Sequence, residues 1–473
     1  MKAKRTVSIA LILTALMASV SCGSDQPQND VTPPPASDSS SVASDETTAP
    51  DHYAGIDLEG FTLRILNVKG VYWNIPMLDH DEMTGDNVSD AVYKRNRDIE
   101  DRLNFKIEIT QSDDTTADLV KTVSAAADEY DAVYTLSDKM QSNITNGYFK
   151  NILNIPEIDV TSDWWDPKLN DDLTVSGKYL YQASSAFNPG GFIRSVAVAF
   201  NKNILGKNNL DAPYELVRSG KWDYDAMREY AAACANLNGD DSFKSGTNAV
   251  FGTTTHPGWV NVVSTGAEGL VQKNDKGELY YAGVSEKLTN ALDKMASVFS
   301  GDGMILNDYE CVEYFMEDRA LFVVTAIGNI GSMRDMNSEY GMIPVPKFDD
   351  ASDYTAPMGS AFLLGIPVTN THLSETAKAL DALSRAGYET VLDTFFESLC
   401  YKGLRDDDSI EMMEIINSAR SADLGYTFGW TVDVMNGIAD KLMKGKTDIA
   451  SSAASAGSKI EEKIKTFMET IAK

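Results

Sequence analysis

The sequence predicts an α/β fold in which strands alternate with helices along the chain. Short runs with an apolar residue at every second position, such as 61–66 (FTLRIL) and 105–109 (FKIEI), predict strands. Segments with apolar residues at helical spacing follow them, and this order calls for a parallel sheet that helices cover on both faces. The length of 473 residues and the hydrophobic content of 43% allow two or three domains.

The first half of the chain shows this alternation most clearly. Val88, Val92, Ile99 and Leu103 are spaced by 4, 7 and 4 residues, which places them on one face of a helix. The other elements expected here are strands at 61–66, 105–109 and 130–136 and a helix at 117–127. Ligands of such sheets bind beyond the carboxyl ends of the strands, so the segments after the first and third strands are candidate binding segments.

The second half continues the pattern from a strand at 195–200, whose Val, Ala and Phe content suits a strand that is buried on both faces. Asp223 or Asp225 can cap the helix that follows Trp222. The other elements expected here are strands at 250–253 and 320–325, helices from Gly258, at 285–299 and from Ser374, and helical structure from 388 to the end.

The composition is strongly acidic, with 41 Lys and Arg against 70 Asp and Glu and a formal net charge of −29. Nucleic-acid binding depends on cationic side chains that meet phosphate groups, so this balance disfavours it. We expect a solvated acidic surface and no nucleic-acid partner.

Motifs that carry catalysis or cofactor binding are missing from the sequence. The four histidines are isolated, and the chain has no HExxH, GxSxG, GxxxxGK[ST] or GxGxxG motif. Cys234, Cys311 and Cys400 lack metal or redox spacing, and we expect buried thiols, with at most one disulfide. The sequence therefore predicts no catalytic residue, no metal and no cofactor.

Residues 1–21 have the pattern of a signal peptide, because three cationic residues precede an apolar run at 7–20 that is shorter than the roughly 20 residues of a membrane span. Cys22 follows in SVSCG, which resembles a bacterial lipobox, although Ser19 stands where that motif usually has Leu. We expect Cys22 to carry a lipid anchor such as palmitate; the alternative is ordinary cleavage with Cys22 incidental. Residues 22–54, rich in Asp, Ser, Thr and Pro, predict a disordered tether.

From about residue 60 to 470 the order of parts resembles bacterial extracellular solute-binding proteins of family 1, the maltose-binding type, which are the substrate receptors of carbohydrate ABC transporters. Two crossings between lobes are matched by AVAFNK at 197–202 and GMIPVPKF at 341–348. Relatives from Gram-positive anaerobes share three further motifs, which here are Trp164-Trp165-Asp166, Gly177-Lys178-Tyr179 and Gly220-Lys221-Trp222.

The resemblance implies a two-lobed periplasmic-binding-protein-like fold of type II, whose discontinuous lobes are joined by a hinge. The implied boundaries are 55–193 plus 343–387 for lobe 1 and 194–342 plus 388–473 for lobe 2. It also implies a monomeric lipoprotein on the outer face of the cell membrane that binds an oligosaccharide or sugar derivative and delivers it to ABC permease subunits. No covalent chemistry is expected.

A sugar site needs aromatic rings for the C–H faces of the sugar and polar groups for its hydroxyls. The candidates for these roles are Asn67 and Trp73 after the first strand, Asp138 and Lys139 after the third, Arg194 at the first crossing, Trp259 at a helix start, and Trp430 in FGWTVDVM. The resemblance aligns the Asp138–Lys139 pair with an Asp–Arg pair that binds sugar, Arg194 with an acidic ligand residue, and Trp430 with a stacking aromatic.

Structural alternatives exist for these residues. Trp73 and Trp430 can be core residues, Asp138 can cap the helix that follows it, and Trp164, Trp165 and Trp222 are expected to pack structurally. Two other functions stay open at this point. One is a surface glycan-degrading enzyme, and the other is a receptor for a sensor kinase or for a non-sugar solute.

Overall fold

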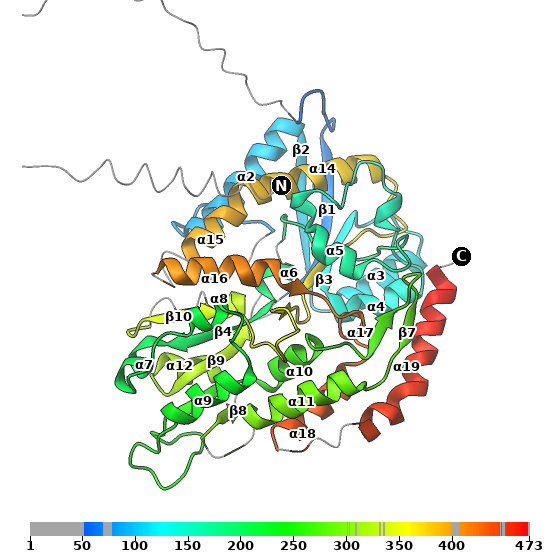
Figure 1. Ribbon diagram of the computed structural model, residues 1–473. Coiled ribbons are helices and arrows are strands. Elements are labelled where there is room, and N and C mark those ends of the chain that lie inside the picture. The colour runs from blue at the N-terminus through cyan, green and yellow to red at the C-terminus, as the bar shows by residue number, and fades with distance from the viewer. Residues whose placement is uncertain are drawn as a thin grey trace, which may run out of the picture. The chain divides into compact units, whose positions relative to one another are not determined.

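The computed structural model describes residues 52–69, 78–188, 190–299, 301, 303–307, 310–330, 333, 336–399, 404, 406–444, 446 and 450–471. The predicted signal peptide, Cys22, almost the whole of the tether, Trp73 and Cys400 lie outside these residues. The chain from Tyr53 onward forms one compact unit, and its mixture of sheets and helices confirms the predicted α/β class (Figure 1).

The first sheet has the strand order β12-β3-β1-β2. Strands β1 (Phe61–Val68), β2 (Phe105–Ser112) and β3 (Ala132–Leu136) are parallel, and β12 (Phe362–Gly365) runs antiparallel to β3. All three predicted strands of the first half are therefore present. Their register places Asn67 beside Tyr134 of β3 and Gln111 of β2.

Helices α2 (Asn87–Leu103), α3 (Thr115–Ser124), α4 (Ser137–Thr145) and α14 (Leu373–Ala386) accompany the first sheet. Asp86 is the N-cap of α2, and its side chain accepts a hydrogen bond from the Ser89 backbone N–H. Asn104 is the C-cap and adopts the left-handed conformation. The predicted apolar face is confirmed, because Val92, Ile99 and Leu103 are buried.

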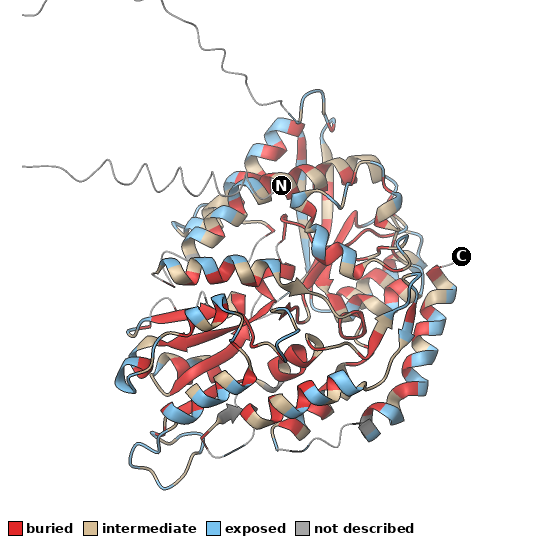
Figure 2. Ribbon diagram, viewed as in Figure 1, coloured by how far each residue is buried: buried red, intermediate tan, exposed pale blue. Residues whose placement is uncertain are grey.

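The second sheet has the order β10-β4-β9-β5-β8. Strand β5 (Phe251–Thr255) is parallel to β8 (Ile305–Asn307) and β9 (Ala320–Ala326), whereas β4 (Val196–Asn201) is antiparallel to β9 and to β10 (Tyr340–Ile343). Every residue of β4 and β9 is buried (Figure 2), and for β4 the apolar run at 195–200 predicts this burial.

Helices α9 (Tyr224–Cys234), α10 (Pro257–Thr265), α11 (Glu286–Phe299) and α12 (Cys311–Met316) belong to the second series. Asp223 caps α9 by accepting a hydrogen bond from the Ala226 backbone N–H at 2.8 Å, which confirms one of the two predicted caps. Cys234 and Cys311 are buried as thiols.

Shorter elements connect these layers. They are η1 (Ile152–Asn154), η2 (Asp163–Trp165), α5 (Pro167–Leu173), α6 (Gly190–Ile193), α7 (Lys202–Lys207), α8 (Tyr214–Arg218), β6 (Val271–Lys273), β7 (Leu279–Tyr281), α13 (Ile327–Ile330) and β11 (Ala356–Pro357). The C-terminal part contains the π-helix η4 (Gly387–Leu392), α15 (Asp393–Leu399), α16 (Asp407–Ser418), β13 (Arg420–Ser421), α17 (Leu424–Thr427), α18 (Val432–Leu442) and α19 (Ala450–Ile471).

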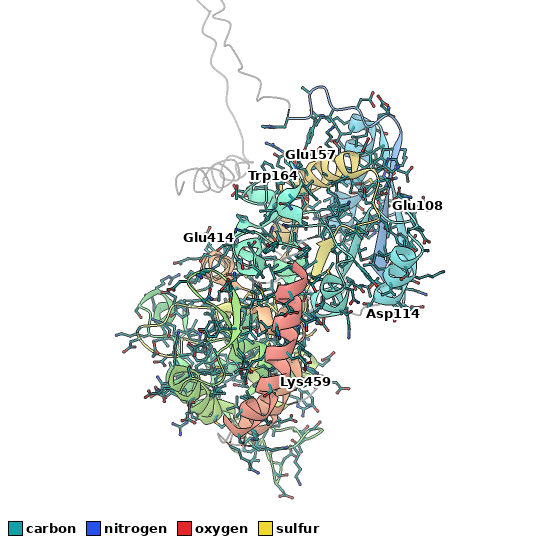
Figure 3. All side chains as sticks on the ribbon, turned by 90° about the vertical axis from the view of Figure 1, so that its right-hand side faces the viewer. Glu108, Asp114, Glu157, Trp164, Glu414 and Lys459 are labelled. Atoms are coloured by element: carbon teal, nitrogen blue, oxygen red, sulfur yellow. The ribbon has the colours of Figure 1, made fainter. Side chains whose placement is uncertain are left out.

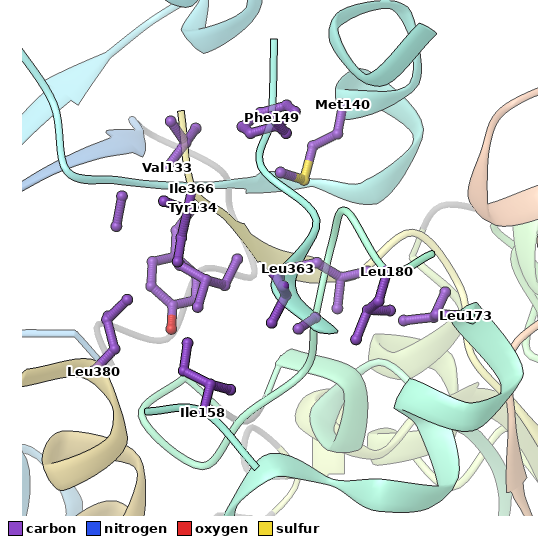
Figure 4. Close-up of a cluster of buried hydrophobic side chains, with 14 of the residues drawn as sticks. Val133, Tyr134, Met140, Phe149, Ile158, Leu173, Leu180, Leu363, Ile366 and Leu380 are labelled. Carbon is purple, nitrogen blue, oxygen red and sulfur yellow. The ribbon is translucent and has the colours of Figure 1, made fainter. Parts of the chain in front are cut away.

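The first core is the cluster of buried residues on β1, β3 and β12, part of which is drawn in Figure 4. The labelled members are Val133, Tyr134, Met140, Phe149, Ile158, Leu173, Leu180, Leu363, Ile366 and Leu380. The second core is the cluster on β4 and β9, and a third cluster joins α2 and α16 to these two strands.

The C-terminal region contributes to both main cores. Phe428, Trp430 and Phe467 pack in the first core, whereas Tyr426 and Met435 pack in the second. The sequence pattern alone did not indicate that residues 424–471 contribute to two different cores. The predicted lobe boundaries after residues 193, 342 and 387 stay predictions.

The motif tryptophans pack structurally, as expected. Trp165 and Trp222 are buried, and the Nε1–H groups of Trp164 and Trp165 both donate to Asp381 at 2.7 and 2.8 Å. Charged side chains such as Glu108, Asp114, Glu414 and Lys459 lie on the outside (Figure 3). Within the part of the chain that the structure describes, no helix is long and apolar enough to cross a membrane.

Candidate functional site

The stretch 358–361, which precedes β12, contacts both the end of β3 in the first sheet and the start of β4 in the second sheet. Met358 bridges Ser195, just before β4, and the Gly359 backbone N–H donates to the Arg194 carbonyl at 3.1 Å. The Ser137 backbone N–H, just after β3, donates to the Ala361 carbonyl at 2.8 Å. This stretch therefore brings the carboxyl end of β3 to the first crossing, where the sequence placed two groups of candidate residues.

Asp138 lies in the first turn of α4 and faces this stretch. Its Oδ1 accepts a hydrogen bond from the Ser360 hydroxyl, and the Lys139 ammonium lies 3.7 Å from its Oδ2. The N-cap of α4 is Leu136, and α4 has no side-chain cap. The alternative in which Asp138 caps the helix is therefore wrong, and its carboxylate, with 25% of the side chain exposed, is available to donors.

Arg194 and Trp259 form a stacked pair beside Asp138. The guanidinium carbon of Arg194 lies 4.7 Å from the centre of the Trp259 ring, and its Nε–H donates to the Ser360 carbonyl at 2.8 Å. Glycine at position 359 allows a close approach to this pair, because a Cβ there would lie 3.1 Å from the indole ring, a tight contact, and 3.6 Å from the guanidinium. Burial lowers the pKa of Arg194 to about 10, and interactions with Tyr426 and Asp138 oppose that shift.

His256 and Tyr426 complete the surroundings of Arg194, and the sequence did not single them out. The Nδ1 of His256 accepts a hydrogen bond from the Gly258 backbone N–H at 2.9 Å and so caps α10. Burial, and then the charge of Arg194, lower the pKa of His256. Burial raises the pKa of Tyr426 to about 12, so both side chains are neutral near pH 7.

The half-buried carboxylate of Asp423 fixes the position of the Tyr426 backbone. Asp423 accepts a hydrogen bond from the Tyr426 backbone N–H at 2.6 Å and caps α17, and desolvation raises its pKa to about 6. An aspartate directly before a helical segment is a capping signal, and this signal could have found Asp423 from the sequence.

Trp430 lies in the first core in this structure. Only 4% of its surface is exposed, and its ring centre is 4.9 Å from that of Phe428 and 5.5 Å from that of Phe467. Its Nε1–H is buried and finds no hydrogen-bond partner among the residues that the structure describes. Stacking of a sugar on this ring would require the aromatic packing to open, so the structure favours the core alternative, and the stacking role stays a prediction.

Gly429, the residue before Trp430, does reach the site. It has a φ of +67°, and a Cβ there would lie 3.5 Å from the Cβ and the carbonyl oxygen of Asp138. The residue of this turn that approaches Asp138 is therefore the glycine rather than the tryptophan.

No hydrogen bond joins Asn67 to this cluster within the described residues. Asn67 is buried near the end of β1, where its Nδ2 donates to Gln111 at 3.1 Å, and its Oδ1 has no hydrogen-bond partner in the described part of the chain. Trp73 lies outside the described residues. The structure therefore brings together Asp138, Lys139, Arg194 and Trp259, and adds Ser360 and Tyr426.

Comparisons with known proteins give structural matches only. No protein-family model matches this chain, and no curated protein matches it. Among solved structures, an ABC substrate-binding protein from Listeria monocytogenes in complex with cycloalternan matches with a TM-score of 0.57 and 12% identity, over 86% of this chain and 99% of that one.

Two further solved structures show the same likeness. The GacH receptor of Streptomyces glaucescens, studied with acarbose, has a TM-score of 0.55 and 13% identity, over 86% of this chain and 99% of that one. An ABC transporter solute-binding protein from Thermotoga lettingae, bound with α-D-tagatose, has a TM-score of 0.51 and 14% identity, over 86% and 100%. The fold of this chain is that of the two-lobed ABC substrate-binding proteins.

Proposed function

We propose that this protein is an extracytoplasmic substrate-binding protein of an ABC importer and that it binds an oligosaccharide or sugar derivative. The observation that carries the proposal is the cluster of Asp138, Arg194, Trp259 and Ser360, in which groups that follow β3 and β5 meet groups that precede β4 and β12. The fold supports it, because ligands of such sheets bind beyond the strand ends.

The donors and acceptors of this cluster match the hydroxyl groups of a sugar. Asp138 accepts hydrogen bonds, Lys139 and Arg194 donate them, and hydrogen bonds to charged groups are stronger than neutral ones. Trp259 supplies an aromatic surface next to them. Asn67, Trp73 and Trp430 remain further candidates for ligand contact.

The cellular setting belongs to the same proposal. A lipid on Cys22 would anchor a monomer to the outer face of the cell membrane, and the segment at 22–54 would let it reach ABC permease subunits. Closure of the two lobes about the segments at 194–200 and 342–347 would enclose the ligand.

A glycan-degrading enzyme is the alternative that the site geometry can address. Such an enzyme needs a carboxylic acid with a raised pKa beside a second carboxylate. Burial raises the pKa of Asp423 and of Asp172, but the two carboxylates already accept hydrogen bonds from the backbone N–H groups of Tyr426 and Ala422. We therefore propose a binding role without covalent chemistry.

A thermal-shift screen tests the proposal with four saccharides: cycloalternan, acarbose, tagatose and maltotriose. A saccharide that binds only the folded protein should add about 2.7 kcal/mol of stability at a hundredfold excess over its Kd. The same incubations are assayed for new reducing ends. Stabilisation without cleavage supports the proposal, whereas cleavage of a saccharide, or no stabilisation by any of a wider glycan set, contradicts it.

A further inference from the structure

A nearly buried ion pair ties the Trp164-Trp165-Asp166 motif to strand β13. The Nη1 and Nη2 atoms of Arg420 donate to Oδ2 and Oδ1 of Asp166 at 2.7 and 2.8 Å, and only 12% and 11% of the two side chains are exposed. The Ser184 hydroxyl also donates to Oδ2 of Asp166, at 2.9 Å. A bidentate Arg–carboxylate pair fixes orientation as well as distance.

Asp166 uses its carboxylate for this pair instead of for the helix that it precedes. It occupies the N-cap position of α5 but makes no side-chain cap, and it adopts the left-handed conformation with a φ of +49°. An aspartate at this position ordinarily accepts a hydrogen bond from the first helical turn. Asp166 therefore does not cap the helix next to it and pairs instead with Arg420, a residue 254 positions away.

The ion pair is the first of several contacts along residues 420–431. The Ala422 backbone N–H donates to the Asp172 carboxylate at 3.0 Å, and the Met358 backbone N–H donates to the Ser421 carbonyl at 2.7 Å. The stretch then forms α17 and closes with a hydrogen bond of 2.8 Å from the Trp430 backbone N–H to the Gly425 carbonyl. Its anchors thus lie in α5 and in the 358–361 stretch that borders the site.

Residues of the 420–431 stretch contribute to the candidate site. Gly429 packs against Asp138, where a Cβ would lie 3.5 Å from the Asp138 Cβ. Tyr426 belongs to the second core, as Trp259 does, and the charges of Arg194 and Asp138 act on its pKa. Phe428 packs in the first core, so the stretch contributes to both cores.

We propose that Asp166 and Arg420 are positioning residues for the candidate site, because their ion pair holds residues 420–431 so that Gly429 lies against Asp138. The effect on ligand affinity rests on the proposed function. The effect on the stretch itself can be measured without any ligand.

Hydrogen–deuterium exchange of the unliganded full chain tests the positioning. In Arg420→Gln, backbone amides of residues 424–431 should exchange roughly tenfold faster or more, the factor that corresponds to a lost hydrogen bond to a charged group. Amides of β4 and β9 should keep their rates. Arg420→Lys should give an intermediate rate, because lysine keeps the charge but loses the two-pronged geometry.

The matched control is Arg218→Gln, which removes an arginine that also pairs with carboxylates but lies on the surface. It should leave residues 424–431 unchanged. If Arg420→Gln does not fold, Asp166→Asn, which keeps a hydrogen-bond acceptor, is compared in the same way. Unchanged exchange at 424–431, or an equal rise in both sheets, overturns the proposal by assigning the pair a general stabilising role.

Affinity for cycloalternan, acarbose and tagatose is the second readout. For a saccharide that the wild type binds, Arg420→Gln should raise Kd by about tenfold or more, the factor that corresponds to a lost hydrogen bond to a charged group. Unchanged affinity despite faster exchange also overturns the proposal. If the wild type binds none of the three, the proposed function fails for them, and the positioning role is judged on exchange alone.

Discussion

Replacing Trp430 by alanine separates a core residue from a ligand-stacking residue. The side chain is 96% buried against Phe428 and Phe467, so truncation removes a large apolar surface and leaves a cavity in the first core. Trp→Ala changes in cores cost about 3–5 kcal/mol of unfolding free energy. A ring that serves only to stack on a ligand would leave the unliganded protein nearly as stable as the wild type.

Urea denaturation of the unliganded protein, followed by fluorescence, measures this loss. We expect Trp430→Ala to lose about 3–5 kcal/mol and Trp430→Phe to lose less, because phenylalanine refills part of the cavity. Trp222→Ala is the matched control, since Trp222 is fully buried in the second core, and its Nε1–H donates to the Pro344 carbonyl at 2.9 Å. Unliganded stability within about 0.5 kcal/mol of wild type for Trp430→Ala would refute the core assignment and restore the stacking role.

Three further predictions concern the site, the anchor and pH. Asp138→Asn should weaken binding of the saccharide found in the screen by about 1.5–3 kcal/mol in calorimetric titration, because hydrogen bonds to a charged acceptor are lost, whereas the exposed Asp114→Asn should change nothing. Wild-type protein expressed in a lipoprotein-processing bacterium should incorporate labelled palmitate and Cys22→Ala should not; an unlabelled wild type would contradict the anchor. Burial raises the pKa of Asp423 to about 6 in the folded protein, so between about pH 4 and 6 the folded protein binds more protons at Asp423 than the unfolded chain does. The contribution of Asp423 to the free energy of unfolding therefore rises as pH falls through that window. Asp423→Asn should remove this contribution, and an identical dependence of unfolding free energy on pH in wild type and variant would show that Asp423 does not titrate there.

The sequence predicted the elements whose pattern is local. Val92, Ile99 and Leu103 form the buried face of α2, and Asp223 caps α9, because helical spacing and capping depend on neighbours in the chain. The buried strand at 195–200 was equally clear from its composition.

The site was predictable only in part, because its contacts join residues far apart in the sequence. Asp138 and Arg194 were found from their places after a strand and at a crossing, but Ser360, which binds both, carries no signal of its own in the sequence. Trp430 was a candidate because the resemblance aligns it with a stacking aromatic residue, yet its burial is decided by tertiary packing with Phe467 of α19. The sequence could not show that the C-terminal helix α19 packs on the first core. An amphipathic pattern indicates that one face of a helix is buried, but it does not indicate which core that face covers.

A crystal structure of the protein with the saccharide that gives the largest stabilisation in the screen would locate the bound ligand. We expect a sugar ring beside Trp259, with hydroxyl oxygens within about 2.5–3.2 Å of the Asp138 carboxylate and of the Lys139 or Arg194 nitrogens. A saccharide bound elsewhere, with no contact to Asp138 or Arg194, would contradict it.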